Sequence, residues 1–490
     1  MKSSYKERLK RWGLFTLIGA LAIMPLMAEE VTEADAPSEE IEATNVIPQE
    51  ESDDYPSVWA VDIVMEGQNY GIYPLGWHDN FKIKMSKEQI EELQLGVETR
   101  ISQIPGVRLK DGNTDSVIKG ATKGEVIKQL FGVIKQFAYP KELGLNKVDA
   151  VTFMKAHGII DSKTSKIALK NPCTVEEGIV LGTRLVDWLY EEFDASTKGY
   201  FWKVDGGKSE VYLLGSVHAA DSRLYPFSKK VLDAYNKADV VGFEIDESNE
   251  ADYDKFIKAI RYTDGTSLKD HVSKATYELL LSYSDLFDLT EEEMSQLKVW
   301  YLSSYISSYS TDDTMQLDKS EGSSDYGVDN YFFTKAHFDD KKIYGLESYE
   351  LQAGMFDSFS DDLQETVLLQ SLGSFLYSPS YSDWDEDDLW ELEKSSSEWL
   401  TLIKNGDIEG FKKYYSQDDG IKDKELSAEY TQKLLTNRDK GMVEKIEKCL
   451  KDDQKNTYFI IVGAAHYISH TNSGVIDQLK QKGYNVTQIK

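Results

Sequence analysis

The chain reads VYLLGSVH at residues 211–218 and YFIIVGAAH at residues 458–466, two copies of one pattern. Each copy is an apolar run of strand length that ends in Gly-x-x-His, and its β-branched and aromatic composition predicts a buried strand. Ligands of open α/β sheets bind beyond the carboxyl ends of the strands. The sequence therefore predicts His218 and His466 at that edge, each preceded by a glycine that lets the chain turn sharply.

A carboxylate follows a third apolar run, since residues 240–243 lead directly into Glu244. One histidine after a strand is more often a hydrogen-bonded structural residue than a ligand, but two copies among only seven histidines favour a functional site. Two neutral imidazoles and a carboxylate make a three-ligand metal site that leaves a position open for water. Mixed nitrogen and oxygen ligands suit Mn, Co or Zn. The sequence thus predicts a metal site formed by His218, Glu244 and His466.

Composition and charge limit the classes of partner. The chain has 490 residues, enough for two or three domains, and a net charge of -30. Nucleic acid is excluded as an expected partner, because phosphate backbones are bound by basic patches and none is apparent. Only Cys173 and Cys449 are present; they could pair, but their spacing does not decide it.

The N-terminal region resembles a bacterial export sequence. Residues 1–28 contain a basic start followed by an apolar stretch, which predicts a signal peptide or an uncleaved N-terminal anchor. Residues 29–55 are acidic and polar, and are expected to form a disordered linker. We therefore expect an extracellular or cell-surface protein that meets the membrane only through this N-terminal segment, if it is retained.

Residues 56–195 are expected to form a smaller, mainly helical domain. Thr122 with Glu125, and Thr174 with Glu177, have the Thr-x-x-Glu spacing of helix capping boxes. Between them, residues 150–157 read as a helix that ends at Gly158. This order of helices resembles the S-layer homology modules that attach proteins to a cell-wall polymer, so the resemblance implies such a polymer as a partner. A helical packing or spacer domain is the alternative.

Residues 198–490 read as an α/β domain, because apolar strand-like runs alternate with long helical stretches. The expected strands are at residues 211–214, 240–243, 342–346, 458–462 and 485–489. Two stretches rich in Ser, Tyr and Asp, residues 303–326 and 378–388, are expected to be loop-like insertions.

Several separated motifs of this domain together resemble the TraB/GumN family. They are YLLGSVH at 212–218, LYP at 224–226, FEID at 243–246, GVD at 327–329, GLES at 345–348 with Gln352, VGAAH at 462–466 and GYNV at 483–486. The resemblance implies a relation to the Tiki metalloproteases and a fold like that of the erythromycin esterase and ChaN group. That fold is α/β (α+β), with a central mixed sheet flanked by helices.

The resemblance also implies roles for individual residues. His218 and His466 would be metal ligands or metal-site bases, and Glu244 a ligand or general base. Asp329 and Glu347 match further acidic positions, which suggests a supporting role around the ligands. The family commonly has an Arg-Asn pair on a late helix; this chain keeps the arginine, as Arg438, and has Asp439 after it.

The sequence favours an exported, metal-dependent hydrolase that acts on peptide bonds. In this interpretation His218, Glu244 and His466 hold the metal ion, and Arg438 stabilises the oxyanion that develops at the attacked carbonyl. Two alternatives stay open. One is a non-catalytic extracellular protein that binds a peptide or a cell-wall component in the same crevice, and the other is an amide or ester hydrolase of small molecules.

Overall fold

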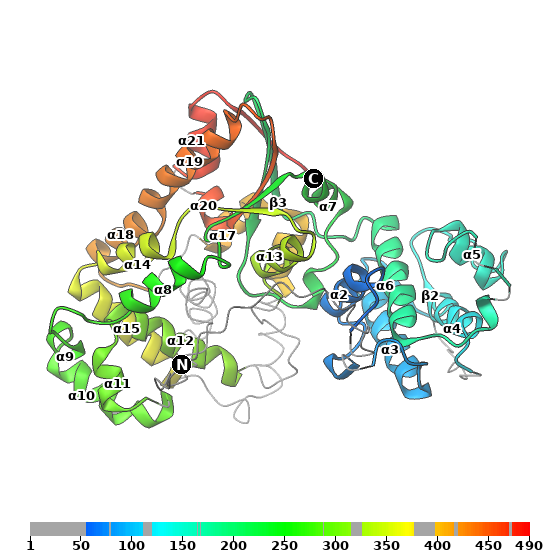
Figure 1. Cartoon of the computed structure of the whole chain (residues 1–490), viewed down its shortest axis with the longest axis horizontal. Helices are drawn as coiled ribbons and strands as arrows, with labels where there is room; N and C mark the ends of the chain where they lie inside the picture. The colour runs from blue at the N-terminus through cyan, green and yellow to red at the C-terminus, as the bar shows by residue number, and fades with distance from the viewer. Residues whose placement is uncertain are drawn as a thin grey trace, which may run out of the picture. The chain divides into compact units, whose positions relative to one another are not determined.

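The computed structural model describes residues 55–490 except 78–79, 111–119, 164, 167, 288, 315–325, 377–396, 416–419 and 470–472. The predictions for residues 1–28, for the acidic linker up to residue 54 and for residues 378–388 lie outside this part of the chain. The described residues form two compact units, residues 55–195 and Ser196–Lys490 (Figure 1). No helix in the described part is long and apolar enough to span a bilayer.

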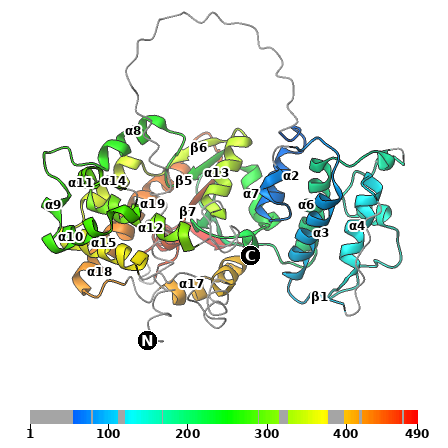
Figure 2. The same ribbon diagram turned by 90° about the horizontal axis from the view of Figure 1, so that it is seen from below.

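The first unit is helical, and α6 lies at its centre. Its helices are α2 (Val61–Asn69), α3 (Lys87–Ser102), α4 (Lys123–Lys135), α5 (Ala150–Ala156) and α6 (Val175–Glu192). Strands β1 (Arg108–Leu109) and β2 (Phe137–Ala138) form a short antiparallel pair. Helices α2 and α3 pack against α6 (Figure 2). Close packing depends on Gly178 and Gly182, because a Cβ there would lie 2.2 Å from the Met85 sulfur and 2.9 Å from Leu93, respectively.

The capping boxes of this unit fix where its helices begin. Thr122 and Thr174 each accept a hydrogen bond from the backbone of the glutamate three residues later, as predicted. Ser86 makes a further capping box at the start of α3. The segments before these helices are joined, since Met85 N donates to Cys173 O and Cys173 N to Ala121 O, both at 2.9 Å. The N-termini of α3, α4 and α6 therefore lie side by side.

Both cysteines are buried and free, so neither takes part in a disulfide bond. Burial raises the pKa of the Cys173 and Cys449 thiols to about 12. Their contribution is therefore that of small buried apolar side chains.

The second unit contains a six-stranded mixed sheet in the order β6-β5-β7-β4-β3-β8. The strands are β3 (Tyr200–Asp205), β4 (Glu210–Ser216), β5 (Val240–Phe243), β6 (Lys342–Gly345), β7 (Thr457–Gly463) and β8 (Asn485–Gln488). Strands β6, β5, β7 and β4 run parallel, and β3 is antiparallel to both of its neighbours. A mixed sheet flanked by helices was the predicted fold, and each predicted strand is present; β3 was not predicted.

Helices cover both faces of the sheet. Helices α7 (Lys229–Lys237) and α13 (Val328–Phe338) lie on one side, and α19 (Asn437–Leu450) and α21 (Val475–Gln481) on the other (Figure 1). Helix α19 buries Met442, Val443, Ile446 and Leu450, a spacing that places its apolar side chains on one face.

Most of the remaining helices form a layer with its own apolar core, built largely from segments between β5 and β7. These elements are α8 (Glu250–Ala259), α9 (Leu268–His271), α10 (Lys274–Ser282), α11 (Glu291–Gln296), α12 (Val299–Thr314), α14 (Tyr349–Asp357), α15 (Asp361–Leu376), α18 (Lys424–Thr431) and the π-helix η7 (Gln432–Thr436). Two further helices lie outside this core: α17 (Ile408–Tyr415) packs its Phe411 against Tyr200 of β3, and α20 (Ala464–Tyr467) follows β7 directly and contacts β4. Helices α12 and α15 make the most extensive contact between two elements of this layer.

The predicted loop at residues 303–326 is wrong for its first half, which continues α12 to Thr314. Three of the serines that suggested a loop, Ser303, Ser304 and Ser307, are buried in the helix and hydrogen-bonded. Ser303 and Ser307 contact the Ser371 hydroxyl at 2.8 and 3.0 Å, and Ser304 donates to the Trp300 carbonyl. Serine hydroxyls that bond within a helix and across a helix pair are compatible with burial, so a serine-rich composition misled the prediction. Residues 315–325 lie outside the described part.

Candidate functional site

The two predicted histidines follow neighbouring parallel strands. Ser216 at the end of β4 and Gly463 at the end of β7 are register partners. His218 comes two residues after the first, and His466 lies in α20, three residues after the second. Because the strands are parallel, both histidines leave the same edge of the sheet, as the sequence predicted.

His466 is completely buried, and one carboxylate holds its ring. Its side chain is 0% exposed, and its Nδ1 lies 2.7 Å from Oδ1 of Asp439. Its Nε2 has no hydrogen-bond partner within the described part of the chain and lies 4.0 Å from Glu244 Oε1. Burial raises the pKa of Asp439, although the hydrogen bond to His466 opposes the shift. The ring therefore presents one unpartnered nitrogen to Glu244.

Glu244 lies directly after β5 and is held by donors on both carboxylate oxygens. Oε1 accepts a hydrogen bond from Gly463 N at 2.8 Å, and Oε2 accepts one from Arg438 Nη2. Burial alone would raise the pKa of Glu244, but the positive charge of Arg438 and the neighbouring histidines lower it to about 2. A carboxylate of such low pKa accepts a proton poorly near neutral pH. Glu244 is therefore held as an ionised carboxylate with both oxygens hydrogen-bonded.

Arg438 is buried between two carboxylates. Its Nη2 lies 2.7 Å from Glu347 Oε2, and its Nε donates to the same carboxylate at 3.0 Å. Gln352 donates to Glu347 as well, at 2.9 Å. Bidentate contact of this kind is the strongest geometry for an arginine and a carboxylate. Glu347 therefore supports the site through Arg438, and the guanidinium is directed at carboxylates.

The π-helix η7 comes just before Arg438 and Asp439, two consecutive residues of α19 that contact the site. Residues of η7 run to Thr436, and α19 begins at Asn437. Arg438 then contacts Glu244 and Glu347, whereas Asp439 contacts His466. Single π turns inside helices are rare and are frequently found at functional sites. Here the turn sets the direction of both side chains.

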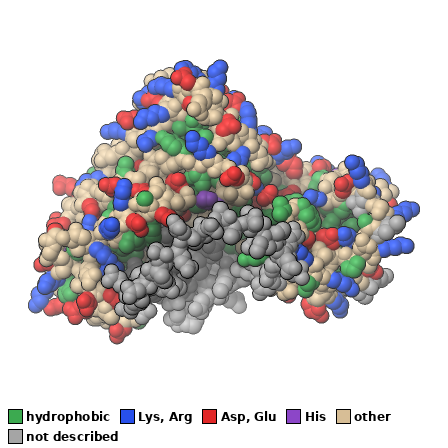
Figure 3. Space-filling model, viewed as in Figure 1, with side chains coloured by type: hydrophobic (Ala, Val, Ile, Leu, Met, Phe, Trp, Pro, Cys, Tyr) green, Lys and Arg blue, Asp and Glu red, His purple; other side chains and the backbone are tan. Residues whose placement is uncertain are grey.

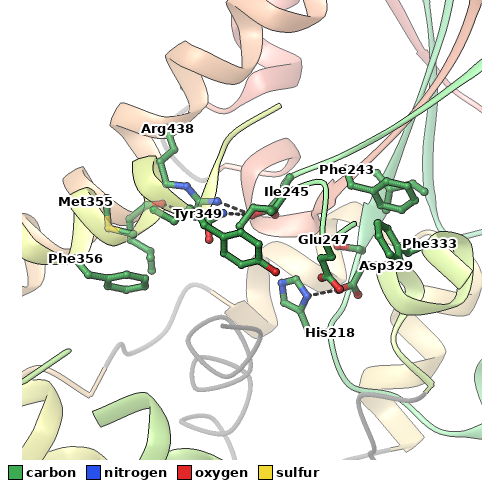
Figure 4. A pocket seen from close by; sticks show the side chains of 15 residues that line it. His218, Phe243, Ile245, Glu247, Asp329, Phe333, Tyr349, Met355, Phe356 and Arg438 are labelled. Atoms are coloured by element: carbon green, nitrogen blue, oxygen red, sulfur yellow. Dashed lines mark hydrogen bonds and ion pairs between the residues drawn. The ribbon is translucent and has the colours of Figure 1, made fainter. Parts of the chain in front are cut away.

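His218 is paired with a second aspartate. Its Nδ1 lies 2.7 Å from Oδ2 of Asp329, which is near the N-terminus of α13 (Figure 4). Backbone contact fixes this end of the helix, because Val328 N donates to Val217 O at 2.9 Å. Burial acts to lower the pKa of His218, but the charge and hydrogen bond of Asp329, together with Glu244, raise it to about 9. The predicted association of Asp329 with the site is therefore visible as a direct contact.

A pocket opens between the strand edge and the helical layer. His218, Glu244, Asp329 and Arg438 line it, together with Glu247. Its apolar walls are formed by Phe243, Ile245, Phe333, Tyr349, Met355 and Phe356 (Figure 4). The side chain of His466 is absent from the lining in the described structure, and its Nε2 lies 4.0 Å from Glu244, which does line the pocket.

The structure does not bring the three predicted metal ligands, His218, Glu244 and His466, into one group. His466 Nε2 and Glu244 Oε1 face each other, but no group of three or more His, Cys, Asp or Glu side chains in the described ranges is close enough to hold one metal ion. His218 shares the pocket with Glu244 and interacts with its charge. Two possible metal-binding atoms, His466 Nε2 and Glu244 Oε1, therefore lie near each other, and His218 lines the same pocket as Glu244.

Some site residues were not predicted. Asp439 was noted only as a departure from an expected asparagine, yet it is the partner of His466. Glu247, Phe333 and Tyr349 line the pocket without any sequence motif that marks them. Only the position of Asp439 directly after Arg438 could have indicated its place.

On the face shown in Figure 3, acidic and basic side chains are intermixed over the described surface. No continuous basic area is visible on that face.

Comparison with known proteins shows the family of the second unit. The model of the TraB/PrgY/gumN family matches residues 200–488, more than half of the chain. Comparison with curated proteins found no match. Comparison with solved structures found none either. The match covers every strand of the sheet and all the site residues described above. The chain therefore belongs to the TraB/PrgY/gumN family.

Proposed function

We propose that the second unit is a hydrolase that cleaves peptide bonds in the pocket at the strand edge, with a divalent metal ion as cofactor. The observation that carries this proposal is the unpartnered Nε2 of His466, buried 4.0 Å from Glu244 Oε1. A buried nitrogen lone pair next to a carboxylate is the donor set that a cation such as Zn, Mn or Co requires.

The charge of the buried network supports a cation. Glu244, Glu347 and Asp439 are carboxylates, and Arg438 is the guanidinium that contacts the first two. In this group the carboxylates outnumber the guanidinium by three to one. Uncompensated negative charge is unfavourable in a protein interior, so a cation would be stabilised here.

The residues would divide the work as follows. His466 and Glu244 would hold the metal ion, with His218 as the third ligand from the pocket wall. A bound metal ion lowers the pKa of water and polarises a carbonyl group. Arg438 keeps Glu244 ionised and fixes its orientation, and Asp329 orients His218. Each of these side chains is thus held before substrate binds.

The apolar walls favour a peptide with a large apolar side chain next to the cleaved bond. Tyr349 and Phe356 are buried at one end of the pocket, and Phe333 lies at the other beside Asp329 (Figure 4). Apolar walls with a few converging polar groups are typical of substrate pockets. A hydrolase of small-molecule amides or esters would use the same metal-binding residues, and its substrate, in place of a peptide side chain, would contact these apolar walls.

The test is peptide-library cleavage by the purified full chain, with Zn, Mn or Co and with a chelator. We expect cleavage to require metal, and His466→Ala to lower metal-dependent activity and metal affinity by at least about 100-fold. His218→Ala should lower both as well. His157→Ala is the matched control, because His157 is exposed at the end of α5 in the first unit, whereas the pocket is lined by residues of the second. Cleavage that is unchanged by the chelator and by both variants would overturn the metal mechanism.

A non-catalytic peptide-binding protein is the second candidate. It is favoured by the engagement of Arg438 with two carboxylates and by the lack of a complete three-ligand group within the described residues. Tight peptide binding that survives the chelator, without turnover, would support this candidate over the hydrolase.

We also propose that the protein acts outside the cytoplasm and that the first unit attaches it to a cell-wall polymer. What supports attachment is the set of capped helix N-termini that lie side by side at α3, α4 and α6. Lys123, at the first position of α4, forms an ion pair with Glu177. Co-sedimentation of the full chain with purified cell walls tests the proposal, which fails if the chain stays in the supernatant.

A further inference from the structure

Among the described residues, one side chain, that of Asp439, hydrogen-bonds to the imidazole of His466. The ring is 0% exposed, so solvent cannot hold it. Asp439, which is 3% exposed, contacts Nδ1 at 2.7 Å, and no other side chain of the described chain hydrogen-bonds to the ring. Whether Asp439 accepts or donates this hydrogen bond therefore decides which nitrogen of the neutral ring carries the hydrogen.

An ionised carboxylate can only accept hydrogen bonds. At 2.7 Å from Asp439, Nδ1 must therefore donate, and Nε2 of the neutral ring is left with its lone pair. In the other tautomer, the lone pair of Nδ1 would face the carboxylate. Its Nε2–H would then face Glu244 Oε1 at 4.0 Å, which is too far for a hydrogen bond. The geometry supports one tautomer of the two.

We propose that Asp439 is a positioning residue that fixes His466 as the Nδ1–H tautomer and presents the bare Nε2 to Glu244. Asp439 does not touch the pocket; it acts through the ring. The inference goes beyond the proposed hydrolase and does not need it, because it describes the metal-free protein. It also assigns a role to the residue that replaces an expected asparagine.

His218 and Asp329 provide a comparison within the same unit. His218, like His466, has its Nδ1 2.7 Å from an aspartate oxygen. The His218 side chain differs in being 16% exposed and in lining the pocket. Water can therefore reach the His218 site and replace a lost partner, whereas at His466 nothing replaces Asp439. Removing the carboxylate should change the His466 ring far more than the His218 ring.

The critical variant is Asp439→Asn. Asparagine has nearly the same shape, but its amide can present either an acceptor or a donor to Nδ1. The ring would stay in place while its tautomer was no longer imposed. Asp329→Asn is the matched control at His218, and it changes the same pair of residue types.

The experiment is a long-range proton–nitrogen correlation spectrum of the full chain, labelled with nitrogen-15 in histidine and freed of metal, at neutral pH. His466→Gln identifies the His466 signals by their loss. We expect wild-type His466 to carry its proton on Nδ1 alone, and Asp439→Asn to show a population with the proton on Nε2. A wild-type ring protonated on Nε2, or on both nitrogens, would overturn the proposal, as would an Asp439→Asn spectrum identical to wild type.

A second measurement separates positioning from folding and from catalysis. Binding of Mn²⁺ alone to Asp439→Asn should weaken by about 10–100-fold, while its melting temperature stays close to that of wild type. Tautomer change without weaker Mn²⁺ binding would leave the positioning role standing and contradict the proposed metal site. If the melting temperature of Asp439→Asn falls while His466 keeps the wild-type tautomer, Asp439 is merely structural. That outcome contradicts the inference.

Discussion

The two units treat buried polar groups differently. In the helical unit three buried hydroxyls bond to main-chain carbonyls, Thr183 to Ile179 O, Tyr190 to Arg100 O and Tyr73 to Val64 O. A fourth, that of Tyr70, bonds to the Asp187 carboxylate. In the α/β unit the buried polar groups at the strand edge are charged, and they contact one another. Natural proteins satisfy buried polar groups locally unless function demands otherwise. The contrast identifies the strand edge as the place where buried charged side chains depend on one another.

Removing the central cation of that edge should have the largest effect. Arg438→Met would leave Glu244 and Glu347 buried without their partner, and we expect a loss of about 3–5 kcal/mol in the free energy of unfolding. Urea denaturation of the full chain measures it.

Lys87→Met in the helical unit is the matched control. It breaks an ion pair with Glu91 in which both side chains are more than half exposed, and it should change stability by less than about 1 kcal/mol. Equal losses for the two variants would show that the strand edge is no more dependent on its charges than the surface of the helical unit.

The helical unit holds one acid whose titration should set its pH dependence. Burial raises the pKa of Asp187 to about 7, although Tyr70 donates a hydrogen bond to it. The folded state thus binds this proton more tightly than the unfolded chain, in which an aspartate has a pKa of about 4. The contribution is fully present below pH of about 4 and is lost as the pH rises through about 7, on the order of 2–4 kcal/mol.

Asp187→Asn should remove this pH dependence, because the amide is neutral throughout the range. Melting curves between pH 4 and pH 8, read by a probe in the helical unit, measure the effect. Glu244 acts with the opposite sign: its lowered pKa of about 2 gives stability that is present above pH of about 4 and lost as the pH falls towards 2. A helical unit that is more stable at pH 8 than at pH 5 would contradict the assignment for Asp187.

The smallest expected effect is at a helix start. Thr122→Ala removes one half of the capping box of α4 and should lower the free energy of unfolding by about 1 kcal/mol. Thr122→Ser keeps the hydroxyl and should cost much less. Chemical denaturation measures both, and a difference below about 0.2 kcal/mol between them would indicate that the cap contributes little.

Much of the fold could be predicted because its strands are short and strongly apolar. The runs that became β4, β5 and β7 stand out from their surroundings, and the capping boxes of α4 and α6 are local signals. Strand β3 was missed because Lys203 and Asp205 interrupt its apolar pattern. Helix α12 was missed because its buried serines bond to the helix and to Ser371, a partner that is distant in the sequence.

The candidate site was predictable where a motif and a strand end coincide. His218, Glu244 and His466 all lie at the predicted edge, since parallel strands bring their carboxyl ends together. The pairing of Asp439 with His466 was not predictable, because it depends on how α19 is rotated about its axis. Nor was the engagement of Arg438 with Glu347, which joins a helix to a strand end 91 residues earlier.

The π-helical turn at Gln432–Thr436 makes the length of this segment as important as its sequence. An α-helix advances by about 100° per residue, so deleting one residue from the turn would rotate the start of α19 by about that angle. Arg438 and Asp439 would then point away from Glu244 and His466, although no side chain of the site had been altered. An insertion or deletion of a single amino acid in this turn would therefore separate Glu244 and His466 from the helix that holds them.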